Sequence, residues 1–167
     1  MEFHLGDPVM HLMYGFGHVS GIEEKFISDQ ANLYYAISIR DLTVWVPVDG
    51  QLESRLRLPT TKDGFKKLFA ILTGPSEPLP DDRQERKLIL VEKLKAGKAA
   101  LICHVLRDLT TFQQGHSLND NDQNLMKRSR EMLLGEWGYA LAITPSEAEK
   151  DLYHMLDVGH LKAPGKA

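Results

Sequence analysis

The segment from Asp41 to Val48 constrains the fold more than any other part of this 167-residue chain. A period of two, with aliphatic residues at alternate positions, is typical of a β-strand that buries one face. The aliphatic face is therefore expected to meet the core, and it comprises Leu42, Val44, Val46 and Val48. Pro47 has no N–H group to donate, so the strand should end near it or lie at a sheet edge.

Trp45 is expected on the opposite face of this strand, together with Thr43. Two interpretations remain open for its ring. A small, strongly curved sheet would bury it as a further part of the core. Alternatively, the ring is an anchor for a protein partner, because Trp is enriched among the residues that dominate binding energy at interfaces.

Residues 1–58 read as short strands with tight turns and no room for a helix. Beside the 41–48 strand, strands are expected over Phe3–Met13 (with a turn at Gly6-Asp7-Pro8), His18–Ile22, Leu33–Ile39 and Leu56–Leu58, with residues 23–32 as a connection. Gly15 and Gly17 flank an aromatic residue and predict a tight bend or a positive φ. No lysine follows them, so a phosphate-binding loop is excluded. The pattern predicts a small SH3-like or Tudor-like β-barrel.

The period changes from two to that of a helix after Pro59. Five helices are expected, each after a capping residue or a break, at about 60–73, 82–96, 99–112, 118–137 and 144–158. In the second, the expected core residues are Leu88, Val91 and Leu94. The predicted fold class is α+β: a barrel over residues 1–58, an all-helical bundle over 59–160, and a disordered tail over 161–167.

Composition and charge limit which partners and which cellular location can be expected for this chain. The chain is 43% hydrophobic and 26% charged, and it carries a net charge of −3. Residues 1–58 hold 4 Lys/Arg against 8 Asp/Glu, whereas residues 83–130 hold 10 against 5. Two surfaces with different partners are therefore expected. The single Cys103 excludes an internal disulfide, and no signal-peptide or membrane-spanning pattern is seen, so a cytoplasmic location is expected.

No motif for catalysis or cofactor binding stands out. The seven histidines form no metal-binding pair with an intervening Glu, and Cys103 and His104 point about 100° apart on a helix, which is wrong for a nucleophile and its base. Neither a phosphate-binding loop nor a nucleophile elbow is present. The sequence therefore favours a binding protein without metal or cofactor, with Cys103 as a buried structural residue.

Seven stretches, in order over nearly the full chain, resemble the CarD family of transcription regulators. They are Phe3-x-Leu5-Gly6-Asp7-x-Val9, Tyr14-Gly15-x-Gly17-x-Val19-x-x-Ile22-Glu23, Asp41-Leu42-Thr43-Val44-x-Val46-Pro47-Val48, Leu56-Arg57, Glu92-Lys93-Leu94-x-x-Gly97, Val105-x-Arg107-Asp108-Leu109 and Leu133-x-Gly135-Glu136. The resemblance implies a Tudor-like domain that docks on the RNA polymerase β subunit. It also implies a helical domain that touches the upstream edge of the transcription bubble and stabilises the open promoter complex.

The chain departs from the family pattern at two positions. Arg83 stands about where family members place a Trp wedge, and Trp45 stands where the polymerase-facing strand usually has a basic residue. Arg83 could enter a narrow minor groove as a cation, or simply lie on a solvated helix face. The residues expected to contact the polymerase are Lys25, Thr43, Trp45 and Pro47.

The residues expected to contact DNA phosphates are Arg83, Arg86, Lys87, Lys127, Arg128 and Arg130. The first three share a helix face by spacing, whereas Arg128 could instead pair with Glu131 or Asp122. Three hypotheses follow: a regulator that binds polymerase and, non-specifically, promoter DNA; a polymerase-binding adaptor without DNA contact; and an enzyme of an unrecognised kind. Salt dependence of binding separates the first two.

Overall fold

The computed structural model describes the backbone of residues 1–161 and the side chains of residues 1–159. The predicted tail lies outside the described residues, apart from Leu161, which ends the last helix. The chain divides into two units between Pro59 and Thr60. None of the described helices is long and apolar enough to span a lipid bilayer.

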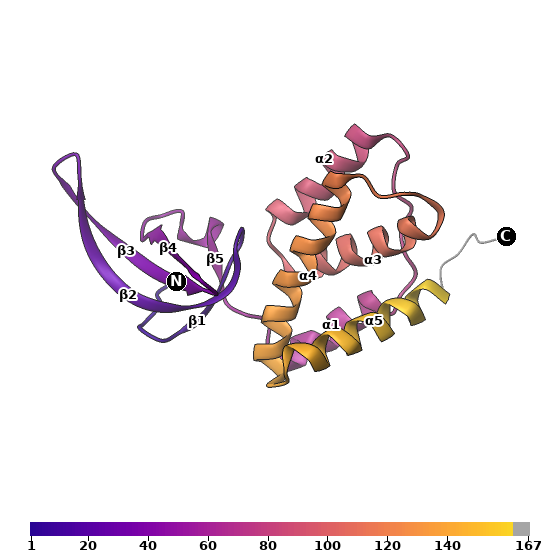
Figure 1. The fold of residues 1–167 in the computed structure, drawn as a ribbon. Coiled ribbons are helices and arrows are strands. Elements are labelled where there is room, and N and C mark those ends of the chain that lie inside the picture. Colours follow the sequence, from indigo (N-terminus) through magenta and orange to yellow (C-terminus); the bar gives the residue numbers. More distant parts are fainter. Residues whose placement is uncertain (162–167) are drawn as a thin grey trace. The chain divides into compact units, whose positions relative to one another are not determined.

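The N-terminal unit is one antiparallel sheet of five strands (Figure 1). The order across the sheet is β4-β3-β2-β1-β5. The strands are β1 (Pro8–His11), β2 (Gly15–Ile27), β3 (Gln30–Ile39), β4 (Leu42–Pro47) and β5 (Leu56–Arg57), with a 3₁₀ turn, η1 (Leu52–Ser54), before β5. This sheet followed by helices confirms the predicted fold class.

The connection predicted at residues 23–32 is wrong, because most of it is strand. β2 and β3 pair up to Ile27 and Gln30, and the turn between them is only Ser28 and Asp29. Both turn residues have positive φ, 52° and 62°, as a tight two-residue hairpin requires. This part of the hairpin lies beyond the core and forms a long arm (Figure 1). Its charged residues in β2 therefore do not alternate with buried apolar residues, as they would in a half-buried strand.

The core of the sheet confirms most of the prediction for the 41–48 strand. Val46 is buried, and Val44 and Val48 pack against the buried cluster. Leu42 is the exception, being 54% exposed, because it opens the strand directly after the turn at Arg40. The buried cluster comprises Phe3, Val9, Val19, Tyr35, Ile37, Ile39, Val46, Leu52 and Leu56.

Gly15 and Gly17, in the first three residues of β2, require glycine for different reasons. Gly15 has a φ of 100°, which side chains rarely tolerate. At Gly17, a Cβ atom would collide with the carbonyl oxygen of Ser38 and with the side chain of Ile39. The positive φ predicted for this stretch is thus found at Gly15, and the close approach of β3 at Gly17 is an additional constraint.

His11 makes the N-terminal unit sensitive to pH. Its Nδ1 accepts hydrogen bonds from the backbone N–H groups of Met13 and Tyr14, at 3.1 and 3.2 Å, so the imidazole is neutral in the fold. Burial lowers the pKa of His11 below its ordinary value of 6.5. The unfolded chain then binds the proton more readily, so this contribution to stability is complete above pH 6.5 and is lost as the pH falls toward the folded pKa.

We expect the melting temperature of the N-terminal unit to fall as the pH is lowered from 7 to 5. The measurement is thermal unfolding of this unit, monitored by the fluorescence of Trp45. His11→Asn should flatten this dependence, whereas His18→Asn, at an exposed position of β2, should leave it unchanged. An equally steep dependence in the His11 variant would contradict the assignment.

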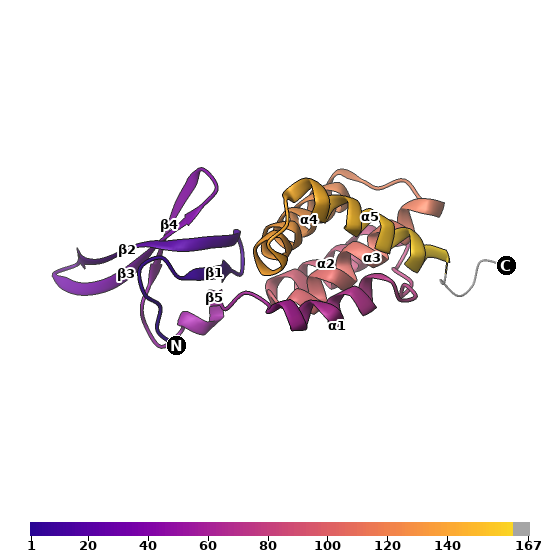
Figure 2. The same ribbon diagram turned by 90° about the horizontal axis from the view of Figure 1, so that it is seen from below.

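The helical unit has the five predicted helices (Figures 1 and 2). They are α1 (Lys62–Leu72), α2 (Arg83–Lys95), α3 (Ala99–Gly115), α4 (Asp120–Leu141) and α5 (Pro145–Leu161). The first turns of α1, α2, α4 and α5 are capped by side chains that accept backbone N–H groups: Thr61, Asp82, Asn119 and Thr144. The first turn of α3, after Lys98, has no such side-chain cap. At α5 the cap is reciprocal, because Glu147 accepts the N–H of Thr144, as its spacing from the threonine predicts.

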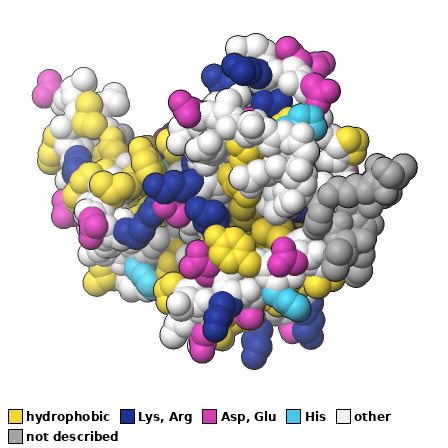
Figure 3. Space-filling model, turned by 45° about the vertical axis from the view of Figure 1, so that its right-hand side comes forward, with side chains coloured by type: hydrophobic (Ala, Val, Ile, Leu, Met, Phe, Trp, Pro, Cys, Tyr) yellow, Lys and Arg dark blue, Asp and Glu magenta, His cyan; other side chains and the backbone are white. Residues whose placement is uncertain are grey.

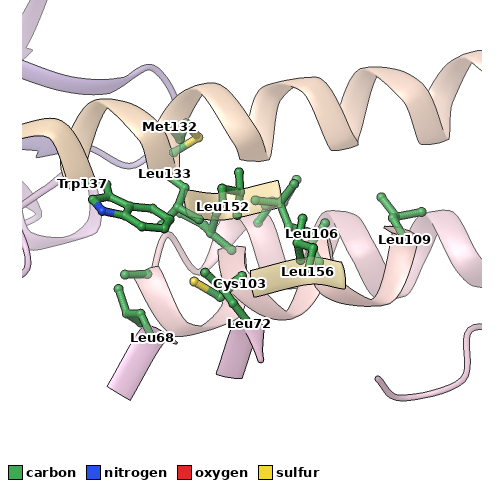
Figure 4. Packing of buried hydrophobic residues seen from close by; sticks show 14 of the residues in the cluster. Leu68, Leu72, Cys103, Leu106, Leu109, Met132, Leu133, Trp137, Leu152 and Leu156 are labelled. Carbon is green, nitrogen blue, oxygen red and sulfur yellow. The ribbon is translucent and has the colours of Figure 1, made fainter. Parts of the chain in front are cut away.

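The core of this unit lies around α3, which packs against α1, α2 and α4 and also contacts α5. Figure 4 shows Cys103 and Leu106 of α3 among side chains of α1, α4 and α5. Cys103 is fully buried, as predicted. Trp137 of α4 is fully buried at one end of this core and stacks at an angle on Phe69, with ring centroids 4.9 Å apart.

The predicted core face of α2 is partly wrong. Leu88 is 71% exposed, and the buried side chains of this helix are those of Arg86, Leu90 and Leu94. These three lie at spacings of four, so they form one stripe along the helix. An arginine therefore occupies the first core position of α2.

Candidate partner-binding surfaces

The structure brings Lys25, Thr43, Trp45 and Pro47 to one face of the sheet, which we call the outer face. The three β4 residues pair with Ser38, Ala36 and Tyr34 of β3, which alternate with the residues that enter the core. Lys25 of β2 pairs with Asn32, on the same side. The four positions expected to contact the polymerase thus share a surface.

Trp45 and Lys25 contact each other on the outer face. The Lys25 Nζ atom lies 3.5 Å from the centroid of the Trp45 ring and 5.9 Å from that of Tyr34. Trp45 is 38% exposed and lies outside the buried cluster, so its interpretation as a core residue is wrong. A cation over an exposed aromatic face stabilises by about 0.5–1 kcal/mol and holds both side chains in place.

β4 is also an edge strand of the sheet. Its far edge carries backbone groups that pair with no other strand among the described residues. At Pro47, the last residue of the strand, this edge lacks an N–H donor. An exposed aromatic ring, a cation and an open strand edge therefore occur together at one side of the N-terminal unit.

Sequence reasoning missed a second exposed feature, the inner face of the β2–β3 arm. Ile22, Phe26 and Leu33 lie on the side of the sheet that carries the core, but beyond its end, and they are 43%, 75% and 45% exposed. The signal in the sequence is Phe26, a large aromatic residue within the segment predicted to be a hairpin connection.

Arg86 has to be removed from the predicted DNA contacts, because its side chain is buried. Its Nε and Nη2 atoms donate to both carboxylate oxygens of Asp122 on α4, at 3.0 and 2.8 Å. Its Nη1 atom donates to the carbonyl oxygens of Pro80 and Asp81, and its guanidinium lies 4.6 Å from the ring centroid of Phe112. The hydrogen bond with Asp122 raises the pKa of Arg86 above its ordinary value. Arg86 therefore links α2 to α4 through Asp122, and we call these two residues the Arg86–Asp122 pair.

The other predicted cations keep different degrees of exposure. Arg83 and Lys87 are exposed and one turn apart on α2, whereas on α4 Lys127 is exposed and Arg128 and Arg130 are half-buried. Asp122 forms its ion pair with Arg86. The predicted alternative in which Arg128 pairs with Asp122 is therefore wrong.

The charge around the start of α2 is mixed. Asp81, Asp82 and Glu85 are exposed beside Arg83 and Lys87. Figure 3 shows the same mixture of basic and acidic side chains at the top of the helical unit, where α2 begins. Mixed charge of this kind does not create one broad positive potential.

Comparison with known proteins agrees with this two-part layout. Residues 3–59 match the CarD-like/TRCF RID domain, and residues 67–153 match the C-terminal domain of CarD. The chain is also 30% identical over 148 residues to a Bacillus subtilis (strain 168) protein named "Putative transcription factor YdeB", a match that covers 87% of this chain and 96% of that protein. Two domain matches in the family's order and a relative aligned over almost its full length show that the chain belongs to the CarD-like family of transcription factors.

Proposed function

We propose that this transcription factor docks on the β subunit of RNA polymerase through the outer face of its sheet and contacts promoter DNA non-specifically through its helical unit. The observation that carries the docking part is the exposed Trp45 ring under the Lys25 ammonium. Family members usually have a basic residue on this strand, and here Lys25 of the neighbouring strand supplies the positive charge. The match to the CarD-like/TRCF RID domain supports a partner in the transcription machinery.

The aromatic ring and the cation suit a polymerase surface with an apolar patch beside a carboxylate. Trp contributes a large contact area with few rotatable bonds, and Lys25 already restricts its ring. The open edge of β4 offers further backbone donors and acceptors. Because all of these lie in residues 1–59, the docking proposal can be tested on the N-terminal unit alone.

Binding of the fragment 1–60 to core polymerase tests the docking proposal. We expect the folded fragment to bind with an affinity close to that of the full chain, measured by calorimetry or biolayer interferometry. A fragment that is folded by circular dichroism but does not bind, while the full chain binds, would refute the assignment of docking to this unit.

The DNA part of the proposal now rests on five cations, with Arg86 left out. Arg83 and Lys87 lie one turn apart on α2, so one stretch of phosphate backbone can meet both. Lys127, Arg128 and Arg130 on α4 provide a second group of contacts. Such contacts position a protein on DNA without reading its sequence.

The double variant Arg83→Ala/Lys87→Ala is expected to keep its affinity for polymerase and to lose most of its effect on open-complex lifetime. Each lost phosphate contact lowers the salt slope of DNA binding by about one unit, so the slope on a fork-junction promoter template should fall by about two. The matched control is Lys66→Ala/Lys67→Ala, which removes two exposed cations from α1.

Unchanged lifetime and slope in the α2 variant would remove α2 from the DNA contact. The adaptor function, in which the chain binds polymerase and a second protein but no DNA, would then be the better account. The mixed charge at the start of α2 is the observation that favours this alternative.

A further inference from the structure

Three potential metal ligands converge where the segment between α1 and α2 lies against α3. One ligand atom each from Glu77, His104 and Asp108 lies within 4.8 Å of the other two. His104 and Asp108 are four residues apart, so they lie on the same face of α3. The segment is fixed here by hydrogen bonds, from the N–H of Glu77 to Asp108 Oδ1 at 3.0 Å and between the hydroxyl groups of Ser76 and Thr111 at 2.5 Å.

A buried carboxylate oxygen without a hydrogen bond makes this cluster more than a chance grouping. Asp108 is 1% exposed, and its Oδ2 atom has no hydrogen-bond partner within residues 1–159. A buried charged oxygen in this state is costly unless a cation or a donor reaches it. Arg107 binds the other oxygen, Oδ1, at 2.9 Å, and the Lys93 Nζ atom is 4.0 Å from Oδ2, at the outer limit of an ion pair.

The other two groups present the atoms that a divalent metal needs. His104 is half-buried on α3 and presents an imidazole nitrogen within 4.8 Å of a carboxylate oxygen of each of the other two residues. Neutral imidazole and carboxylate are ordinary ligands of Zn²⁺. Glu77 is exposed, so its carboxylate can move toward an ion without disturbing the core.

We propose that Glu77, His104 and Asp108 form a site for one divalent transition-metal ion of the Zn²⁺ class, with solvent as the fourth ligand. Around a tetrahedral ion at about 2.1 Å, donor atoms lie roughly 3.4 Å apart, so the three side chains close by about an ångström. The ion ties the segment before α2 to α3, and Asp108 gains a partner for its unsatisfied oxygen.

Two cations oppose the ion and limit its affinity. Arg107 donates to Asp108 Oδ1 at 2.9 Å and stays in place, being buried. Lys93 competes for Oδ2, but its side chain is 23% exposed and can swing into solvent. Removal of the Lys93 charge is therefore expected to tighten binding, an effect that a merely structural cluster would not show.

The test uses the full, untagged chain after treatment with a chelator. Zn²⁺ is titrated by calorimetry, and Co²⁺ is titrated by its visible absorption, which reports coordination directly. We expect one ion per chain and, at about 100 times the dissociation constant, a rise of about 5 °C or more in melting temperature.

The variants decide which side chains bind the ion. Glu77→Gln and His104→Gln should each weaken Co²⁺ binding at least about tenfold. Lys93→Met should strengthen it. His154→Ala, which removes an exposed histidine from α5, should bind as the unchanged chain does. Absence of Zn²⁺ and Co²⁺ binding at millimolar metal, or binding undiminished in folded Glu77→Gln, would overturn the proposal.

Discussion

Arg86→Ala is expected to lower the free energy of unfolding of the helical unit by about 3–5 kcal/mol, the cost of breaking a buried ion pair. Asp122 is 1% exposed and would keep its charge without the two hydrogen bonds from the guanidinium. The variant would also lose the hydrogen bonds to Pro80 and Asp81, which hold the segment before α2. The measurement is urea unfolding followed by the fluorescence of Trp137 in a Trp45→Phe background.

Two further variants separate the pair from the helix that carries it. Arg83→Ala removes an exposed arginine one turn away and should change stability by no more than about 0.5 kcal/mol. Arg86→Met/Asp122→Leu removes both charges and should recover most of the loss, because neither charge is then left alone. A stability loss below about 1 kcal/mol in Arg86→Ala would contradict the role of the pair.

Trp45→Ala is expected to weaken binding to core polymerase by roughly 2 kcal/mol or more, about thirtyfold, as for an aromatic hot spot. The ring is 38% exposed in the free protein and already held by Lys25, so it can be buried on docking with little loss of side-chain entropy. Lys25→Ala should show a smaller loss, since it removes the charge and the restraint but not the ring. Affinity is measured by calorimetry with the full chain.

The control for Trp45 comes from the same strand. Leu42→Ala truncates a 54% exposed side chain on the opposite face of β4 and should leave affinity nearly unchanged. The melting temperature of the N-terminal unit should change little in Trp45→Ala, since the ring is outside the core. Unchanged affinity, or an affinity loss fully accounted for by unfolded protein, would refute the hot-spot role.

Local patterns in the sequence were sufficient to predict the order and type of most elements and the fold class. The period of two in residues 42–48 and the helical period after Pro59 each reflect a strong difference between a buried and an exposed face, so the fold class could be predicted. The same holds for the cap at Thr144 and for the special backbone at Gly15, because both depend on residues a few positions apart. The β2–β3 arm was missed because it extends past the core, where no buried face imposes a pattern.

The functional state of individual side chains depended on partners distant in the sequence. Helical spacing places Arg86 relative to Arg83 and Lys87, but it cannot say which stripe of α2 faces the core when Leu88 and Leu90 point to different sides. The tertiary structure decided this by placing Asp122, 36 positions along the chain, against Arg86.

The pairing of Lys25 with Trp45 was decided in the same way. It depends on the register of β2, β3 and β4, which the hairpin turns and the core side chains fix together. The sequence alone thus determined the elements and the fold class, because periodicity and capping are local. Only the tertiary structure decided which cations are buried and which aromatic ring is exposed, because burial and charge pairing are properties of groups brought together by folding.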